Sequence, residues 1–206
     1  QAVNAAELHS AGEIVTIVTE RSDGYGDIAL AWAALVALTA LTVLAVFPVF
    51  YLGLVDRVLD RWTHVWTPGA VLALATGAAT LKFIAMLAVQ AWQPLKFALV
   101  PRHIKAARVR ARAITCFKVG AERRTHGRTG VLIYLSLREH RAEIVADAAI
   151  AARVSPEVWA EAMAPMLAQI RAGRLGDGMV AAIEQVGAVL AQHFPRAEDD
   201  RNELPD

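Results

Sequence analysis

Apolar residues predominate in two long stretches of the chain and in several short ones. Residues 28–52 and 69–92 form the long runs, and the first of them contains no charged residue. At about 1.5 Å per helical residue, each run is long enough to cross a hydrocarbon core about 30 Å thick. We therefore expect two antiparallel membrane-spanning helices within residues 28–95, with Pro48 kinking the far end of the first helix.

The short runs on either side of this hairpin predict a water-soluble domain. Residues 13–19 are rich in β-branched side chains without polar alternation, which is typical of a strand covered on both faces and indicates a central strand. Residues 131–137 and 142–146 predict two further strands joined by a charged turn. Because one strand cannot form a sheet, we expect 13–19 to pair in parallel with 131–137, so that the hairpin and the helix after it form the crossover.

The expected fold class is therefore α/β, a mixed sheet with helices on both faces, interrupted by a two-helix transmembrane hairpin. Its expected segments are 1–27, the first part of the domain; 28–95, the hairpin, with spans at about 28–52 and 69–92; 96–195, a basic helix and the remainder of the domain; and 196–206, a charged tail that we expect to be disordered. Because the chain opens with Gln1 rather than methionine, we expect it to be a fragment of a longer protein.

Basic residues are concentrated locally, although the formal net charge is only +1. This balance argues against a nucleic-acid-binding protein, which needs a broad excess of Lys and Arg. The connector between the spans carries Arg57 and Arg61, whereas the stretch after the second span carries Lys96, Arg102, Lys105, Arg108, Arg110 and Arg112. Since basic loops remain on the cytoplasmic side, this asymmetry predicts that the soluble domain and both termini are cytoplasmic.

A basic amphipathic helix is expected from Pro101 to about Val119. Its predicted buried stripe consists of Ile104, Ala107, Ala111, Ile114 and Phe117. The opposite face carries Arg102, Lys105, Arg108 and Arg112. Anionic lipid headgroups would attract these side chains by about 1 kcal/mol per charge. Lipid contact is the interpretation we favour, and docking on an acidic partner is the alternative.

Polar and aromatic side chains mark the hairpin as a surface for contacts. Lys82 lies near the middle of the second run, where a charge costs about 3 kcal/mol on insertion scales. We expect it to pair with a neighbouring membrane protein; snorkelling and an ion or proton pathway are the alternatives. Trp62 and Trp66 lie in the connector and are expected to anchor it at the membrane interface or contact the partner.

Catalytic chemistry has only weak candidates in the sequence. The expected topology brings Arg128, Thr129 and Asp147 to one edge of the sheet, where an arginine, a hydroxyl and a carboxylate could bind an anion. A phosphoryl-transfer site usually needs in addition a metal held by several carboxylates, or a dedicated nucleophile. The six histidines have no metal-ligand spacing, and Cys116 is the single cysteine. We expect no metal site, no cofactor and no internal disulfide.

Several short motifs follow one another in a characteristic order. They are Gly12-Glu13-Ile14-Val15, Ser22-Asp23, Arg128-Thr129-Gly130-Val131-Leu132-Ile133-Tyr134, Ala142-Glu143-Ile144-Val145-Ala146-Asp147, Trp159 and His193-Phe194-Pro195. This order resembles the TPM domain family, and in particular its bacterial branch in which two membrane spans interrupt the domain. The resemblance covers nearly the whole chain and implies a mixed sheet with helices on both faces.

Two functions follow from this resemblance as expectations. Members of the family share attachment to membrane complexes, which implies an accessory subunit of the bacterial inner membrane that binds or stabilises a larger complex. The alternative is a membrane-tethered phosphatase, because phosphatase activity has been attributed to some members. Many members end the third strand with a Gly-aromatic-Gly stretch, whereas this chain has Asp147-Ala148-Ala149-Ile150. That departure counts against carrying over a catalytic assignment.

Overall fold

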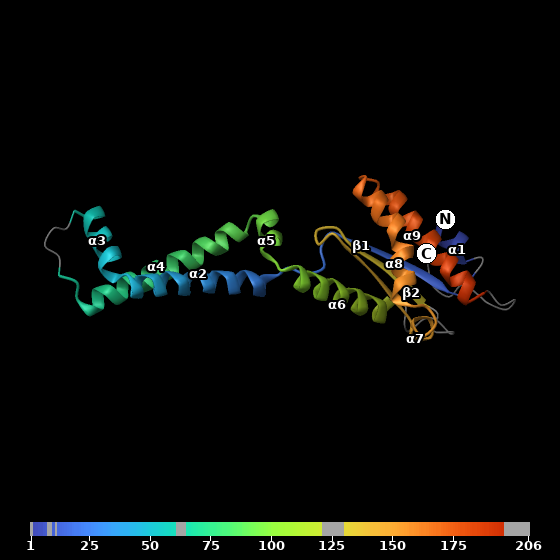
Figure 1. Ribbon diagram of the computed structural model, residues 1–206, viewed down its shortest axis with the longest axis horizontal. Coiled ribbons are helices and arrows are strands. Elements are labelled where there is room, and N and C mark those ends of the chain that lie inside the picture. Colours follow the sequence, from blue (N-terminus) through green and yellow to red (C-terminus); the bar gives the residue numbers. More distant parts are fainter. Residues whose placement is uncertain (1, 8–9, 11, 61–64, 121–129, 196–206) are drawn as a thin grey trace. The chain divides into compact units, whose positions relative to one another are not determined.

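The chain forms two compact units, one of which is inserted into the other. A computed structural model describes residues 2–7, 10, 12–60, 65–120 and 130–195 (Figure 1). The discontinuous unit comprises Gln1–Asp23 and Arg102–Asp206, and the helical unit comprises Gly24–Pro101. The expected tail, 196–206, lies outside the described residues.

A three-stranded mixed sheet forms the centre of the discontinuous unit. Its strands are β1 (Glu13–Thr19), β2 (Gly130–Ser136) and β3 (Arg141–Ala146), in the order β1-β2-β3. Strands β1 and β2 are parallel, and β2 and β3 are antiparallel. The predicted parallel pairing and the predicted hairpin are therefore both confirmed.

The expectation that residues 13–19 form a central strand is wrong for the part of the chain that the structure describes. Strand β2 occupies the centre and all seven of its residues are buried, whereas β1 lies at an edge and Val18 is 45% exposed. Strand β1 lacks polar alternation because helices cover both faces of the sheet. A continuous apolar run indicates that both faces of a strand are covered. It does not indicate whether the strand lies at the centre or at the edge of the sheet.

Helices pack on both faces of this sheet. They are α1 (Ala2–Glu7), α6 (Arg102–Gly120), α7 (Ala148–Ala151), α8 (Pro156–Arg171) and α9 (Leu175–His193). On one face, Ile14, Val131 and Ile133 form the larger core with residues of α8 and α9. On the other face, Leu132 and Tyr134 pack against α6.

The buried stripe of α6 differs from the predicted one. Val109, Ala113 and Phe117 face the sheet, whereas Ala107 and Ala111 are exposed. Residues four apart lie on one side of a helix, so this set forms a continuous stripe over Leu132 and Tyr134. The prediction was right for Phe117 and wrong for Ala107 and Ala111, because α6 is rich in alanine, whose small apolar surface does little to favour one side of a helix over another.

The helical unit contains α2 (Gly26–Val46), α3 (Pro48–Val58), α4 (Pro68–Gln90) and α5 (Gln93–Leu99). The expected single helix over 28–52 is broken between Val46 and Pro48, because proline lacks a backbone N–H and begins a new helix. Helices α2 and α4 are long and apolar enough to cross a membrane. They pack closely where Ala29 and Ala33 are buried, and the Gln90 side chain donates to the Ala29 carbonyl at 3.0 Å.

Candidate functional site

Asp147 holds the beginning of β2 against the end of β3. Its carboxylate accepts a hydrogen bond from the Gly130 N–H at 2.9 Å, and its own N–H donates to the Gly130 carbonyl at 3.0 Å. The side chain is buried, and the Asp147 carbonyl accepts bonds from the N–H groups of Ile150 and Ala151 in α7. These contacts give Asp147 a structural role. The other two candidates, Arg128 and Thr129, lie outside the described residues.

A second polar cluster lies at the carboxyl ends of β1 and β2. The buried carboxylate of Glu139 accepts bonds from the Ser22 N–H, at 3.0 Å, and from the Ser136 hydroxyl. The hydroxyls of Ser22 and Tyr134 share a hydrogen bond of 3.0 Å. Burial raises the pKa of the Tyr134 phenol, while its bond to Ser22 acts in the opposite direction. The sequence prediction missed this cluster, although a tyrosine within a buried strand is a signal that its hydroxyl needs a partner.

The polar cluster joins the loop after β1 to the turn after β2. Arg138 in that turn donates from Nε to Glu20 at 2.9 Å, which adds an exposed pair to the buried bonds. Across the parts of the chain that are described, no three His, Cys, Asp or Glu side chains lie close enough to hold a metal ion. The hydrogen bonds of the cluster therefore hold the loop after β1 against the turn after β2.

The basic face of α6 is partly engaged within its own unit. Arg108 lies 3.3 Å from the carboxylate of Asp23, and the Arg102 carbonyl accepts a bond from Arg141 at 3.3 Å. The side chains of Arg102 and Arg112 are exposed, and Lys105 is half-buried. Arg108 therefore has an internal partner, whereas the exposed cations remain accessible to an anionic surface.

The polar residues predicted for the hairpin have different surroundings. Lys82 is exposed on α4. Trp66 donates from Nε1 to the Asp56 carboxylate at 2.9 Å, and thereby links the chain before α4 to α3. Thr67 caps α4 by accepting a bond from the Ala70 N–H at 3.2 Å. Trp62 lies outside the described residues.

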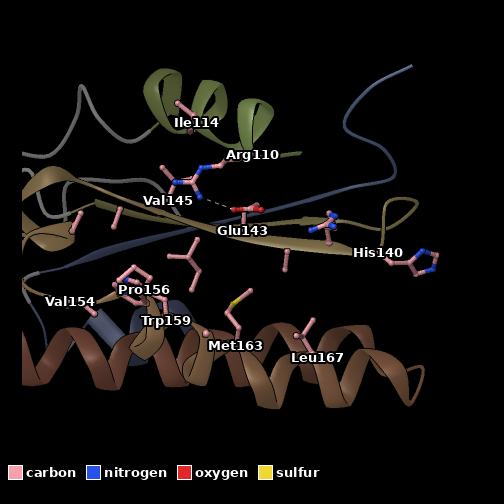
Figure 2. A pocket seen from close by; sticks show the side chains of 16 residues that line it. Arg110, Ile114, His140, Glu143, Val145, Val154, Pro156, Trp159, Met163 and Leu167 are labelled. Atoms are coloured by element: carbon pink, nitrogen blue, oxygen red, sulfur yellow. Dashed lines mark hydrogen bonds and ion pairs between the residues drawn. The ribbon is translucent and has the colours of Figure 1, made fainter. Parts of the chain in front are cut away.

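An open groove of about 700 Å³ runs along the outer edge of β3 (Figure 2). Helix α6 supplies Arg110 and Ile114 on one side, and Arg110 lies 3.4 Å from the carboxylate of Glu143 in β3. On the other side, α7, α8 and the residues between them supply Ala151, Val154, Pro156, Trp159, Ala160, Met163 and Leu167. One wall is therefore charged and the other is apolar. The sequence prediction did not find this groove, because its position depends on which strand lies at the edge of the sheet.

Strand β3 presents unpaired backbone groups to this groove. Within the described chain it pairs with β2 alone. Because Asp147 donates its N–H to Gly130, the alternation of an antiparallel ladder directs the N–H and C=O groups of Ala142, Ile144 and Ala146 away from β2. The groove therefore combines a free strand edge with two walls of different chemistry.

Comparisons with known proteins support the fold. No protein-family model matches the sequence, and no curated protein matches it significantly. The structure is similar to the NMR structure of the BA42 protein from the psychrophilic bacterium Bizionia argentinensis, with a TM-score of 0.53 and 20% sequence identity. The match covers 99% of this chain and 83% of that chain. At this level of identity, the likeness concerns the fold alone.

Proposed function

We propose that this protein is a membrane-anchored accessory subunit that binds a larger membrane protein complex. The observation that carries this proposal is the exposure of α2 and α4. Of the most apolar 18-residue stretch in each helix, 11% is buried in α2 and 0% in α4. A core helix of a soluble protein buries its apolar side chains, whereas a membrane helix exposes them to lipid or to another membrane protein. At about 1.5 Å per residue, each helix is long enough to cross a bilayer.

The proposal places the discontinuous unit on the cytoplasmic side of the bacterial inner membrane. It rests on the excess of Lys and Arg after α4 over that in the connector. Exposed cations of α6, which begins one residue after the helical unit ends, would contact anionic headgroups. A reporter fused to the carboxyl terminus is expected to remain cytoplasmic, and an exported reporter would overturn this orientation.

The accessory role is favoured over catalysis by the way the polar groups are used. Asp147 and Glu139 are buried carboxylates, and each accepts hydrogen bonds that hold segments of the unit together. The motif order that resembles the TPM domain family supports the same role, because members of that family attach to membrane complexes. We include membership of this family in the proposal.

The test is gentle detergent extraction followed by native sizing. The chain is expected to migrate with a larger complex, and Lys82→Met is expected to weaken that association because it removes the exposed cation of α4. Lys118→Met removes an exposed lysine from the end of α6 and is the matched control. A chain that migrates alone, with no protein co-purifying, would contradict the proposal.

A further inference from the structure

We propose that the groove along β3 binds an extended segment of the partner protein, which adds a fourth strand to the sheet. The segment would carry apolar side chains toward α8 and acidic side chains toward α6. This inference rests on the proposed accessory function, and it names the surface and the chemistry through which the discontinuous unit recognises its partner.

The backbone of β3 supplies the first requirement for strand addition. The outward N–H and C=O groups of Ala142, Ile144 and Ala146 form a regular row of donors and acceptors, which an extended peptide can match. All six residues of β3 are half-buried, so the edge is accessible without being fully exposed. A six-residue edge strand with only two charged side chains is also prone to unwanted pairing, and a bound partner would protect it.

The two walls of the groove determine which side chains the added strand can carry. Successive residues of a strand point to opposite faces of a sheet, so alternate residues of the segment would meet different walls. Trp159, Met163 and Leu167 project from α8 toward the sheet edge, and Leu167 is 37% exposed (Figure 2). This wall suits aliphatic side chains at every second position.

The opposite wall favours negative charge. The charged side chains that line the groove are those of Arg110, Arg141 and Glu143, so two cations face one carboxylate. Glu143 is paired with Arg110 at 3.4 Å, and Arg141 uses one guanidinium nitrogen to donate to the Arg102 carbonyl. A guanidinium has five N–H donors, so each arginine retains donors for a carboxylate of the partner.

A second copy of the chain fits this groove less well. If two β3 edges paired in an antiparallel manner, the two-fold axis would be perpendicular to the sheet, and both α6 helices would lie on the same face. Their basic walls, with Arg110 and Arg141 in each copy, would then approach one another. Like charges in such an arrangement are destabilising, so we assign the groove to another protein.

Peptide probes test this assignment on the full chain in detergent micelles. A labelled eight-residue peptide of alternating valine and glutamate is expected to bind at least tenfold more tightly than one of alternating valine and lysine. Methylating the backbone nitrogens of either the valines or the glutamates should abolish binding, while methylating the other set should be tolerated, because only one set faces β3. Equal binding of both charge types, or indifference to both methylations, would overturn the proposal.

Variants locate the binding surface. Arg110→Glu is expected to weaken binding of the valine–glutamate peptide about tenfold, whereas Lys118→Glu, a charge reversal at an exposed position of α6 outside the groove, should leave it unchanged. Ala142→Pro removes an outward donor, does not affect the bonds to β2 and should also weaken binding. Unchanged binding in both groove variants would overturn the assignment, as would a wild-type dimer that these variants dissociate.

Native sizing separates this inference from the function on which it rests. If the wild-type chain migrates with a larger complex and Arg110→Glu does so equally well, the accessory function stands and the groove assignment fails. If the wild-type chain migrates alone, the accessory function itself fails.

Discussion

Asp147 joins two strands through both its backbone and its side chain. The buried carboxylate accepts the Gly130 N–H, so removing it leaves a buried donor without its partner. A buried polar group that loses its hydrogen bond costs about 1–3 kcal/mol. The sequence analysis correctly placed Asp147 at the end of the sheet where β2 begins. It could not show the structural role of the carboxylate, because the partner is a backbone N–H that only strand pairing brings close.

Replacement of Asp147 is therefore expected to affect stability rather than catalysis. Asp147→Ala should lower the free energy of unfolding by about 1–3 kcal/mol, and Asp147→Asn by less because its amide oxygen can still accept the bond. Pulse proteolysis in urea measures both changes. A phosphatase activity of the purified chain that Asp147→Ala abolished without a loss of stability would show the opposite, namely a catalytic carboxylate.

Tyr134 is expected to make the discontinuous unit less stable at alkaline pH. Burial raises its pKa above the ordinary tyrosine value of about 10, so the folded state holds the phenol proton more tightly than the unfolded state does. The resulting stabilisation is complete below pH 10 and is lost as the pH rises through the folded-state pKa. Tyr134→Phe should reduce this alkaline loss of stability, as measured by urea unfolding at a series of pH values. Equal pH profiles for the two proteins would disprove this linkage.

At the scale of elements, strands were easier to predict than helix orientation. β-branched runs predicted β1 with its observed bounds, and the charged turn predicted the β2–β3 hairpin. The buried side of α6 was predicted only in part: Phe117 was expected to be buried, whereas Val109 and Ala113 were not, because alanine occurs on several sides of this helix. The groove was also not predicted, since it depends on how α6 and α8 pack beside β3 on opposite faces of the sheet.

Close packing of α1 on α9 depends on Gly187. A Cβ atom built at this position lies 2.6 Å from the Cβ atom of Ala6, which is too short for a nonbonded contact. Gly187→Ala should therefore displace α1 and speed hydrogen exchange of its amides. Gly176→Ala, in the same helix with no atom within 4 Å of the added Cβ, is the control and should leave α1 unchanged. Equal exchange in both variants would contradict the packing argument.

At the scale of the whole molecule, the insertion of one unit into another was predictable from the sequence. The first strand needs a partner, and among the residues that the structure describes the next strand begins at Gly130. The structure places the ends of the insertion close together, because Asp23 forms an ion pair with Arg108 in the second turn of α6. The point at which a long apolar helix breaks was harder to predict, since one kinked helix was expected where α2 and α3 are separate helices.

The discontinuous unit should fold without the helical unit. Replacing residues 24–101 with a short Gly-Ser linker is expected to yield a water-soluble protein, because the linker removes the exposed apolar helices and joins neighbouring ends. Deleting residues 1–23 as well should destroy the fold, since β2 would lose its parallel partner. Amide dispersion in two-dimensional NMR spectra distinguishes the two outcomes. An unfolded linker variant would show that the helical unit is needed for folding.

The pairing of β1 with β2 cannot occur until the ribosome has synthesised the whole inserted unit. Ser22 and Glu139, which close the carboxyl ends of these strands, are 117 residues apart. At about 5–20 residues per second, the ribosome makes the second about 6–23 s after the first. Throughout that interval β1 is without its neighbour while both apolar helices emerge. Delivery of the helices to the membrane can therefore begin before the sheet is able to close.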